Sequence, residues 1–582
     1  MSNSRYFQSE LTYLKEAGNE FSKQHPQLAN FLSESTYDPD VERLLEGFAF
    51  LTGRIREKID DEYPELTQSL MTLLWPHYTR SIPSMCIAQL TPNSGGVTEK
   101  TRVASGVEMA SKLVDGTKCI FKTCYNVDLY PIQINSVKQE NSRSSSVISL
   151  NLSVENDLEL ARIGLDTLRF YLNGERYISM SIFLWLFRYL DYIELDTGDG
   201  SRKRLPASMI SPVGYSDDES LLPYGENSFA GYRLLQEYFS LPEKFMFFDL
   251  NGLDWLKGLP QRNTVKISFV FSRALPLDVV IKDKHFKLNC TPIVNLFDKD
   301  ADPIRVEHKQ TQYKVRPQSL NQDHYEVYSI NNVDSWDNNE RKRKQLLEFE
   351  SFEHQVNTFE KQDYYKSNVA ERASGSGFER YISFYTHQNE ITNLSSETVL
   401  MKLTCSNANL PERLIIGDIT YSTQNSPGYA SFTNISKPTA SVSPNINGAL
   451  QWQLISNMSL NYLSLTNIDA LKVLLSTYDF NANSDRQSQR TSQQRLDGIK
   501  NIFTVPIERI YKGVSIRGMK IKMDMNSSMF TNEGDMFLFA SVLNEFIRLY
   551  ASINSFTELE VENVVNNEVY NWSSKVGQQP IL

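Results

Sequence analysis

The stretch Val265-Lys266-Ile267-Ser268-Phe269-Val270-Phe271 carries the clearest structural pattern in the chain. Its large apolar side chains recur at every second position, which is the period of a β-strand that buries one face. The same two-residue period begins near Met85 and continues to Met109, among Gly, Ser and Thr residues that favour turns. These segments predict that the body of the protein is built mainly from β-sheet.

Helical patterns occupy the N-terminal segment 1–80. Apolar side chains recur there at intervals of three and four positions, which is the spacing of one helical face. Asp38 and Pro39 suit the cap and the first turn of a helix, so a second apolar stripe is expected to start directly after them. The two stripes consist of Phe7, Leu11 and Leu14, and of Val41, Leu44, Phe48, Leu51 and Ile55.

Further helices interrupt the strands of the body. Residues 177–190 are expected to form a buried helix, and residues 232–239 a short helix before a strand at 245–250. A last helix is predicted over 535–551, with a closing strand at 557–561. The predicted fold class is α+β, with a helical N-terminal segment, then a multi-domain mixed or antiparallel β-rich body with a C-terminal helix.

The length indicates several domains, since 582 residues at about 100–200 per domain give roughly three or four. We expect a boundary wherever the dominant pattern changes. The predicted division is a helical bundle-forming segment at 1–80, a mixed α/β domain at 81–260, a β-rich domain at 261–447 and an α+β C-terminal domain at 448–582.

Three polar stretches are interpreted as irregular. They are rich in residues that favour turns or solvent over regular backbone pairing. We interpret residues 139–146 as a polar loop, residues 422–448 as a long loop or domain junction, and residues 484–495 as a mobile insertion.

Charge and composition exclude several classes of protein. The chain has 59 Lys and Arg against 70 Asp and Glu, a net charge of −11, whereas a protein that binds nucleic acid through a broad face is basic. The polar start of the chain lacks the apolar core of a secretion signal. The longest apolar run, Ile182 to Phe187, is far shorter than the roughly 20 residues of a membrane span. We therefore expect a cytoplasmic protein with no nucleic-acid binding and no direct membrane insertion.

The acidic residues Asp298, Asp300 and Asp302 resemble the opening of a calcium-binding loop. Alternating carboxylates in such a loop converge on one cation. An EF-hand loop also needs glycine at its sixth position and glutamate at its twelfth, and Pro303 and Lys309 stand there. A solvated turn is therefore the favoured interpretation.

No other local motif predicts a catalytic, metal or cofactor site. The five cysteines are widely spread, and Cys119 and Cys124 would point to opposite faces of one strand, which favours buried cysteines over a shared metal. Gly513 and Gly518 have the outer spacing of a phosphate loop, but Met519 follows where lysine is required. We therefore predict no catalytic residue, no metal ligand and no cofactor.

The composition instead favours a protein that works by contact. The chain has 29 Tyr and 31 Phe, and aromatic side chains dominate interface energetics. The candidates for partner contact are the apolar stripes of the segment 1–80, namely Phe7, Leu11, Leu14, Val41, Leu44, Phe48, Leu51 and Ile55. Such a stripe is buried either inside its own subunit or against a partner, and the sequence leaves both arrangements open.

Several short sequence words stand in a distinctive order along the chain. They include Tyr13-Leu14-Lys15-Glu16, His25-Pro26-Gln27-Leu28-Ala29, Asp38-Pro39-Asp40-Val41-Glu42-Arg43-Leu44-Leu45-Glu46-Gly47-Phe48, Trp75-Pro76-His77-Tyr78, Leu288-Asn289-Cys290-Thr291-Pro292 and Trp452-Gln453-Leu454-Ile455-Ser456. In this order, from about Tyr6 to Val561, the chain resembles the TssF family, also called VasA or ImpG. Members of that family are baseplate subunits of the type VI secretion system.

The resemblance implies a structural wedge component without catalysis. It implies two copies paired with one TssG, contacts to TssK and TssE, and a place around the VgrG spike. It also implies docking at the inner-membrane complex and a part in sheath assembly and effector delivery. Two alternatives stay open from the sequence: a wedge protein of a contractile phage or prophage, and a hydrolase whose acids, first Asp298, Asp300 and Asp302, converge in the fold.

Overall fold

The computed structural model divides the chain into two compact units. One unit comprises Met1–Leu73 with Asn445–Ser456, and the other comprises Leu74–Pro444 with Asn457–Leu582. The structure describes residues 7–8, 10–14, 43–44, 46–53, 71, 76–93, 95–155, 158–198, 200–224, 230–258, 262–306, 310–337, 342–349, 363–372, 377–385, 397–444, 467–483, 486–511, 514–551 and 555–577.

The described residues of the first unit have helical backbone, including 10–14 and 46–53. These pieces are too short to establish the helical segment expected over 1–80. The segment as a whole therefore stays a prediction, and its candidates Val41 and Ile55 lie outside the described residues.

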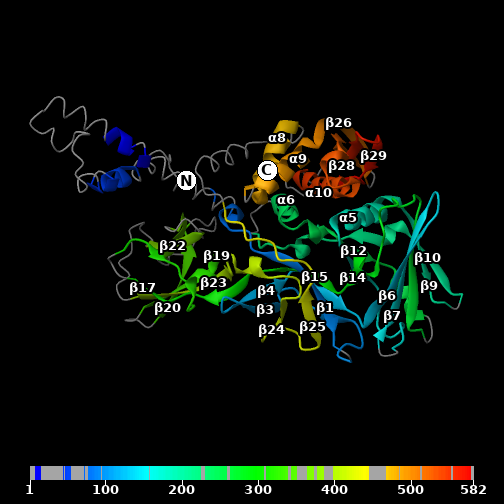
Figure 1. The fold of residues 1–582 in the computed structure, drawn as a ribbon, viewed down its shortest axis with the longest axis horizontal. Helices are drawn as coiled ribbons and strands as arrows, with labels where there is room; N and C mark the ends of the chain where they lie inside the picture. The colour runs from blue at the N-terminus through cyan, green and yellow to red at the C-terminus, as the bar shows by residue number, and fades with distance from the viewer. Residues whose placement is uncertain are drawn as a thin grey trace, which may run out of the picture. The chain divides into compact units, whose positions relative to one another are not determined.

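A six-stranded antiparallel sheet lies at the centre of the second unit (Figure 1). Its order is β24 (Ile419–Ser422), β3 (Glu108–Val114), β4 (Thr117–Thr123), β15 (Cys290–Val294), β1 (Met85–Pro92) and β25 (Ala430–Asn434). All four residues of β1 from Met85 to Ala88 are buried, so both faces of this part of the strand are covered. Cys86, Leu90, Phe121 and Phe432 belong to one apolar core on this sheet.

The strand that the sequence marks most clearly is β13 (Thr264–Phe271), which belongs to a second sheet. Val265, Ile267, Phe269 and Phe271 are all buried, which confirms the predicted alternation. β13 is central in a five-stranded antiparallel sheet ordered β10 (Arg202–Pro206), β9 (Leu190–Asp196), β13, β7 (Ser146–Val154) and β6 (Ile132–Asn141). A four-stranded sheet is ordered β11 (Ile210–Pro212), β12 (Phe247–Leu250), β8 (Leu168–Leu172) and β14 (Phe286–Leu288), and a two-stranded one pairs β2 (Thr101–Val103) with β5 (Val127–Leu129).

An eight-stranded sheet occupies the left of Figure 1. Its order is β16 (Phe297–Asp300), β23 (Glu397–Ser406), β19 (Glu326–Asp337), β20 (Lys342–Glu348), β21 (Tyr364–Glu371), β22 (Phe378–Tyr385) and β18 (Tyr313–Lys314), and β17 (Ile304–Arg305) also pairs with β23. In β23 the residues Val399, Met401, Leu403 and Cys405 are buried in one core, so this strand has the period of two that a sheet face requires.

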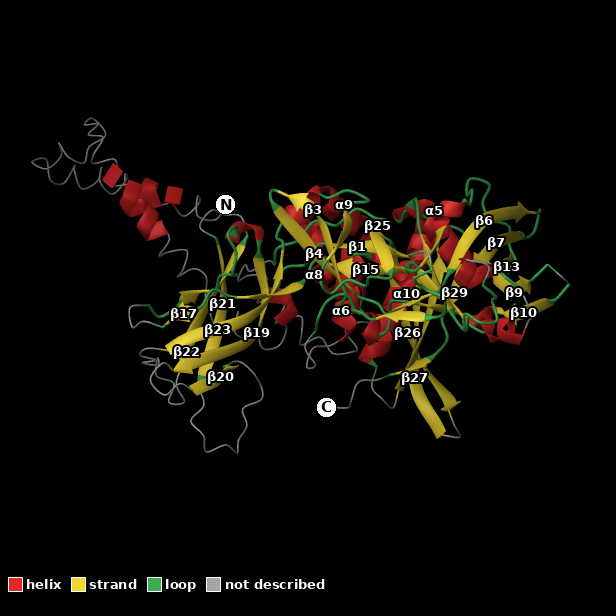
Figure 2. Ribbon diagram, turned by 90° about the horizontal axis from the view of Figure 1, so that it is seen from below, coloured by secondary structure: helices red, strands yellow, loops and turns green. Residues whose placement is uncertain are grey.

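The C-terminal residues form a sheet ordered β26 (Ile499–Tyr511), β27 (Val514–Met525), β28 (Ser555–Asn563) and β29 (Glu568–Asn571), with β30 (Lys575–Val576) also paired to β28. Figure 2 shows β26 and β27 as a hairpin that extends beyond the rest of this sheet, and the two strands pair along their whole length. β27 and β28 are parallel, and helix α10 (Glu533–Tyr550) connects them. A parallel pair needs such a crossover, and α10 packs against β28.

The helices of the second unit gather around α10, which contacts α5 (Arg176–Leu184) and α6 (Ala230–Ser240). A π-helical turn, Trp185–Tyr189, continues α5, and α6 contacts α8 (Ile468–Tyr478). Among the described residues, no helix combines the length and the apolar character that crossing a membrane requires. Short 3-10 turns lie at Pro76–Thr79, Ala207–Met209, Asp217–Glu219, Pro242–Phe245, Leu253–Gly258, Asp283–His285, Gln322–His324, Leu410–Arg413, Phe480–Asn483 and Ser527–Met529.

Two of the stretches that the sequence predicts to be irregular contain regular structure. The predicted loop at 422–448 includes β25, an edge strand of the six-stranded sheet that buries Phe432. The predicted mobile insertion at 484–495 contains the start of helix α9 (Arg486–Asp497). α9 forms although its sequence is almost wholly polar, and its buried residues are Ser492 and Leu496.

The polar loop at 139–146 is shorter than predicted. β6 extends to Asn141 and β7 starts at Ser146, so only residues 142–145 connect the two strands. The hydroxyl of Ser142 accepts a hydrogen bond from the Ser145 backbone N–H at 3.1 Å, which closes the turn. Residues 139–141 are polar because this end of β6 turns a face to solvent.

Strand pairs join residues on both sides of the predicted boundary at 260/261. β13 pairs with β7 and β9, and β15 pairs with β1 and β4. The division at 1–80, 81–260, 261–447 and 448–582 stays a prediction of the sequence pattern alone.

Candidate functional site

The predicted contact stripe is partly described, and its described members differ in exposure. Leu44, Phe48 and Leu51 expose 74%, 56% and 60% of their surface. Phe7, Leu11 and Leu14 are half-buried. Three large apolar side chains of this stripe are thus largely exposed.

Two of the acids that resemble a calcium loop, Asp298 and Asp302, have separate partners. Asp298 and Asp300 lie on β16, and the carboxylate of Asp298 pairs with the ammonium of Lys122 at 2.7 Å. Asp302 accepts a hydrogen bond from the side chain of Gln322 at 3.2 Å. Over the residues that the structure describes, no three His, Cys, Asp or Glu side chains gather closely enough to hold a metal ion. The hydrolase interpretation therefore gains no support from these acids.

The five cysteines are free and buried, as expected for Cys119 and Cys124. Cys119 lies in β4, and Cys124 follows the end of that strand. Burial raises the pKa of the Cys119 thiol to about 11. A thiol with a raised pKa is a poor nucleophile and a poor metal ligand at neutral pH, so these cysteines fill the core.

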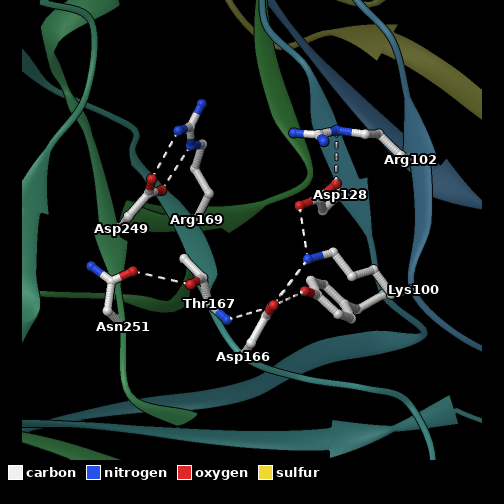
Figure 3. A network of polar contacts seen from close by, with 9 residues as sticks. Lys100, Arg102, Asp128, Asp166, Thr167, Arg169, Asp249 and Asn251 are labelled. Atoms are coloured by element: carbon white, nitrogen blue, oxygen red, sulfur yellow. Dashed lines mark hydrogen bonds and ion pairs between the residues drawn. The ribbon is translucent and has the colours of Figure 1, made fainter. Parts of the chain in front are cut away.

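A network of ion pairs lies beside β2, β5 and β8 (Figure 3), and its members Arg102, Asp128, Arg169 and Asp249 line a cavity of about 110 Å³. The ammonium of Lys100 lies 3.1 Å from Asp166 and 3.2 Å from Asp128, and Arg102 lies 3.4 Å from Asp128. The guanidinium of Arg169 donates two hydrogen bonds to Asp249, at 2.7 and 2.8 Å. Such a paired fork is the strongest geometry for an Arg–carboxylate contact.

The charges of this network already satisfy one another. Partial burial raises the pKa of Asp166, but hydrogen bonds from Lys100, Tyr130 and the Thr167 backbone together lower it to about 2. Arg169 also donates to Glu219 at 3.0 Å. The network therefore fixes β2, β5, β8 and β12 relative to one another, and we assign it a structural role.

A fully buried ion pair lies next to this network. Lys244 and Glu237 expose 1% and 0% of their side chains and contact each other. Lys244 also donates to the Glu219 carbonyl at 3.0 Å, and Glu237 accepts the backbone N–H groups of Leu221 and Leu222 at 2.7 and 3.0 Å. Burying two charges is tolerated only when each is paired and hydrogen-bonded, and here both are. The pair ties α6 to the segment that precedes it.

A second buried charge joins three helices. Asp535, in the first turn of α10, lies 3.0 Å from Arg176 of α5 and 3.8 Å from Arg495 of α9. Its carboxylate also accepts the Thr531 backbone N–H at 3.2 Å, while Asn532 caps the helix by accepting the Asp535 N–H at 2.9 Å. The contact to Arg495 ties the polar helix α9 to α10.

The Asp535 contacts predict a pH dependence of stability. Burial raises the pKa of Asp535, but Arg176 and Arg495 lower it further, so the folded value lies below the ordinary value. The carboxylate therefore stabilises the fold above about pH 4, and this contribution is lost as the pH falls through the folded pKa. We expect Asp535→Asn to cost about 2 kcal/mol at pH 7 and less at pH 2.5, closer to the folded pKa, measured by urea unfolding.

The matched control for this experiment is Asp254→Asn. Asp254 is 66% exposed and pairs with Lys257 on the surface. We expect a loss of less than about 1 kcal/mol at both pH values. An equal penalty for Asp535→Asn at both pH values would show that its charge is not what stabilises the fold.

Comparison with known proteins adds to this geometry. A family model described as "Type VI secretion system, TssF" matches residues 2–579. The chain is 27% identical over 621 residues to the type VI secretion system component TssF1 of Pseudomonas aeruginosa, with 99% of each chain covered. A chain of the solved TssK-TssF-TssG baseplate subcomplex of the type VI secretion system matches with a TM-score of 0.77 and 29% identity, covering 92% of this chain and 99% of that one.

A second solved structure, titled as the baseplate complex from the type VI secretion system, contains a chain with a TM-score of 0.67 and 26% identity. That match covers 100% of both chains. Because the family model spans nearly all residues, from 2 to 579, the chain belongs to the TssF family of the type VI secretion system.

Proposed function

We propose that this chain is a structural wedge subunit of a type VI secretion baseplate and assembles with TssG and TssK. The observation that carries this proposal is the likeness, over nearly the whole chain, to a subunit of the TssK-TssF-TssG subcomplex. The role is contact without turnover. The charged side chains around Lys100, Arg169 and Lys244 are paired with one another and stabilise the fold. We therefore assign no reaction to this network.

The further partners follow from the family resemblance. A second copy of the chain, TssE and the VgrG spike complete the proposed wedge, which docks from the cytoplasm at the inner-membrane complex. Co-expression of the chain with TssG, followed by a mass measurement, tests the first step of this assembly. Two copies of the chain with one TssG support the proposal, and a lone chain at micromolar concentration argues against it.

The N-terminal stripe is the proposed surface for TssG and the second copy. Exposure of Leu44, Phe48 and Leu51 supports burial against a partner over burial within the subunit. An isolated helix of this length is marginal in water and is stabilised by burying its apolar face. Each such side chain contributes about 1.5–3 kcal/mol on burial, so Phe7, Leu11, Leu14 and the second stripe from Val41 to Ile55 suffice for a stable helical bundle.

A charge at Phe48 tests this surface. We expect Phe48→Asp to abolish co-purification with TssG, because the interface would bury an unpaired carboxylate. The measurement is affinity co-purification of the co-expressed pair, with circular dichroism of the variant alone to establish that it folds. A folded Phe48→Asp chain that still binds TssG would exclude the stripe as the interface.

The matched control is Phe50→Asp. Phe50 is 50% exposed, close to the 56% of Phe48, but it lies off the predicted stripe. We expect this variant to bind TssG as the unmodified chain does. If both variants lost TssG binding equally, a charge anywhere in this segment would disrupt binding. The effect would then not be specific to the stripe.

A further inference from the structure

A small cavity of the second unit has an excess of positive charge. It measures about 60 Å³ and is lined by residues 79–81, by Pro444 and by strands β18, β19, β21 and β22. Its charged lining consists of Arg80, Lys314, Arg316, Arg372 and Arg380 against Asp323, Glu326 and Glu379. This balance is opposite in sign to the net charge of −11 of the whole chain.

Four of these charges neutralise one another. Lys314 pairs with Glu379 at 2.6 Å, and Arg372 pairs with Asp323 at 3.2 Å. Arg372 also lies 3.9 Å from Glu379. The two acids Asp323 and Glu379 are therefore committed to Lys314 and Arg372.

Arg80 and Arg380 have no such partner. Within the described chain, neither guanidinium forms an ion pair with a carboxylate within 4.0 Å, and the buried Nε of Arg380 has no hydrogen-bond acceptor. Arg380 donates to the Tyr328 carbonyl at 3.1 Å, while Arg80 lies 5.3 Å over the Tyr328 ring. Both guanidinium groups thus contact one tyrosine, and Arg380 keeps an unused donor in its Nε.

The positive charges of Arg80 and Arg380, both half-buried, repel each other. Burial, together with the positive charge of Arg80, lowers the pKa of Arg380 to about 10, although Glu348 and Glu326 oppose this shift. Burial also raises the pKa of Glu326, so that acid is a weak counter-charge. An anion between the two arginines would remove their repulsion and accept the free N–H of Arg380. Because the guanidinium fork matches two oxygens at once, the fitting ligand is an oxyanion.

The cavity also lies beside both ends of the segment Leu74–Pro444 of the second unit. That unit starts at Leu74, close to Arg80, and its first segment ends at Pro444, which lines the cavity. Just beyond the cavity, Ile82 and Val442 exchange backbone hydrogen bonds at 2.8 and 2.9 Å. A ligand in the cavity would therefore stiffen both segment ends together.

We propose that Arg80 and Arg380 form a binding site for one oxyanion group, a carboxylate or a phosphate, which orders residues 79–82 and 442–444. The cavity volume of about 60 Å³ suits a single small group. The carboxylate would come from an acidic side chain of a neighbouring subunit, and the phosphate from free inorganic phosphate.

The test uses the full chain in chloride, acetate and phosphate buffers of equal ionic strength. Hydrogen exchange of the Ile82 and Val442 amides is the first readout, and isothermal titration with sodium phosphate or sodium acetate is the second. We expect saturable protection of both amides in phosphate, in acetate or in both. Protection in phosphate alone identifies a phosphate site, and protection in acetate identifies a site for an acidic side chain.

Variants separate this site from general salt effects. Arg380→Gln and Arg80→Gln are each expected to weaken binding at least about tenfold, because each loses a charge-assisted hydrogen bond. Arg343→Gln is the control, since Arg343 is 63% exposed and already paired with Asp334. If Arg380→Gln does not fold, Arg80→Gln carries the test. Absence of saturable protection, or equal protection in both Arg80→Gln and the unmodified chain, overturns the proposal.

Discussion

Replacing Lys244 with methionine is expected to lower the free energy of unfolding by about 3–5 kcal/mol. The substitution keeps the apolar stem of the side chain but leaves the carboxylate of Glu237, 0% exposed, without its counter-charge. It also removes the ammonium of Lys244, which donates a hydrogen bond to the Glu219 carbonyl at 3.0 Å in the unmodified chain. Urea unfolding followed by tryptophan fluorescence measures the loss.

Two companion variants identify the cause of that loss. Lys244→Met combined with Glu237→Gln is expected to recover part of it, because the amide removes the buried charge and keeps an acceptor for the Leu221 and Leu222 N–H groups. Lys257→Met breaks an ion pair that is 41% and 66% exposed, so its cost is expected to stay below about 1 kcal/mol. A loss as small for Lys244→Met as for Lys257→Met would contradict the assigned role of the buried pair.

Replacing Gly534 with alanine is expected to cost about 3 kcal/mol, the upper end for overpacking. Gly534 lies in the first turn of α10, where an added Cβ would overlap the backbone carbonyl of Met180 in α5 and come within 3.2 Å of the Met180 side chain. The atoms that the added Cβ would overlap belong to the backbone of α5. The overlap can therefore be relieved only if α10 moves away from α5. Alanine favours a helix over glycine by only about 1 kcal/mol, which is too little to offset this clash. Urea unfolding of the variant against the unmodified chain measures the cost.

The control for steric overlap is Gly258→Ala. An added Cβ there meets nothing within 4 Å, and the backbone of Gly258 is compatible with alanine. We expect a change of less than about 1 kcal/mol, of either sign. A neutral result for Gly534→Ala would show that α5 and α10 separate at little cost.

The parts of the fold that the sequence predicts are those where local pattern and tertiary environment agree. β13 alternates because one of its faces is buried. In α10, where the sequence predicts a helix over 535–551, Phe539, Val542, Leu543 and Phe546 are buried. In these elements the side chains that define the period also fill the core, so the period suffices to locate them.

The elements that sequence reasoning missed depend on contacts from distant segments. α9 has no apolar stripe, and it is held through Arg495 by Asp535, a residue of another helix. β25 is short and lies in a stretch rich in turn formers, but it pairs with β1, which lies near the start of the second unit. The local spacing of apolar side chains does not indicate such distant partners.

The charged clusters were missed for the same reason. Lys244 and Glu237 lie close in sequence, but the backbone groups that make their burial tolerable come from Glu219, Leu221 and Leu222. Arg80 and Arg380 are distant in sequence and meet only around Tyr328. By contrast, Asp298, Asp300 and Asp302 are near neighbours in sequence, and the described contacts of Asp298 and Asp302 are separate. Proximity along the chain was therefore a poor guide to charge clusters in this protein.

The strand order around β1 constrains how this chain emerges from the ribosome. β1 ends at Pro92, yet its two neighbours in the sheet are supplied by Cys290–Val294 and Ala430–Asn434. At a synthesis rate of about 5–20 residues per second, its fully apolar first half waits for roughly tens of seconds with both edges unpaired. An open apolar edge of this kind invites aggregation, so nascent-chain chaperones have a defined window and a defined strand to protect.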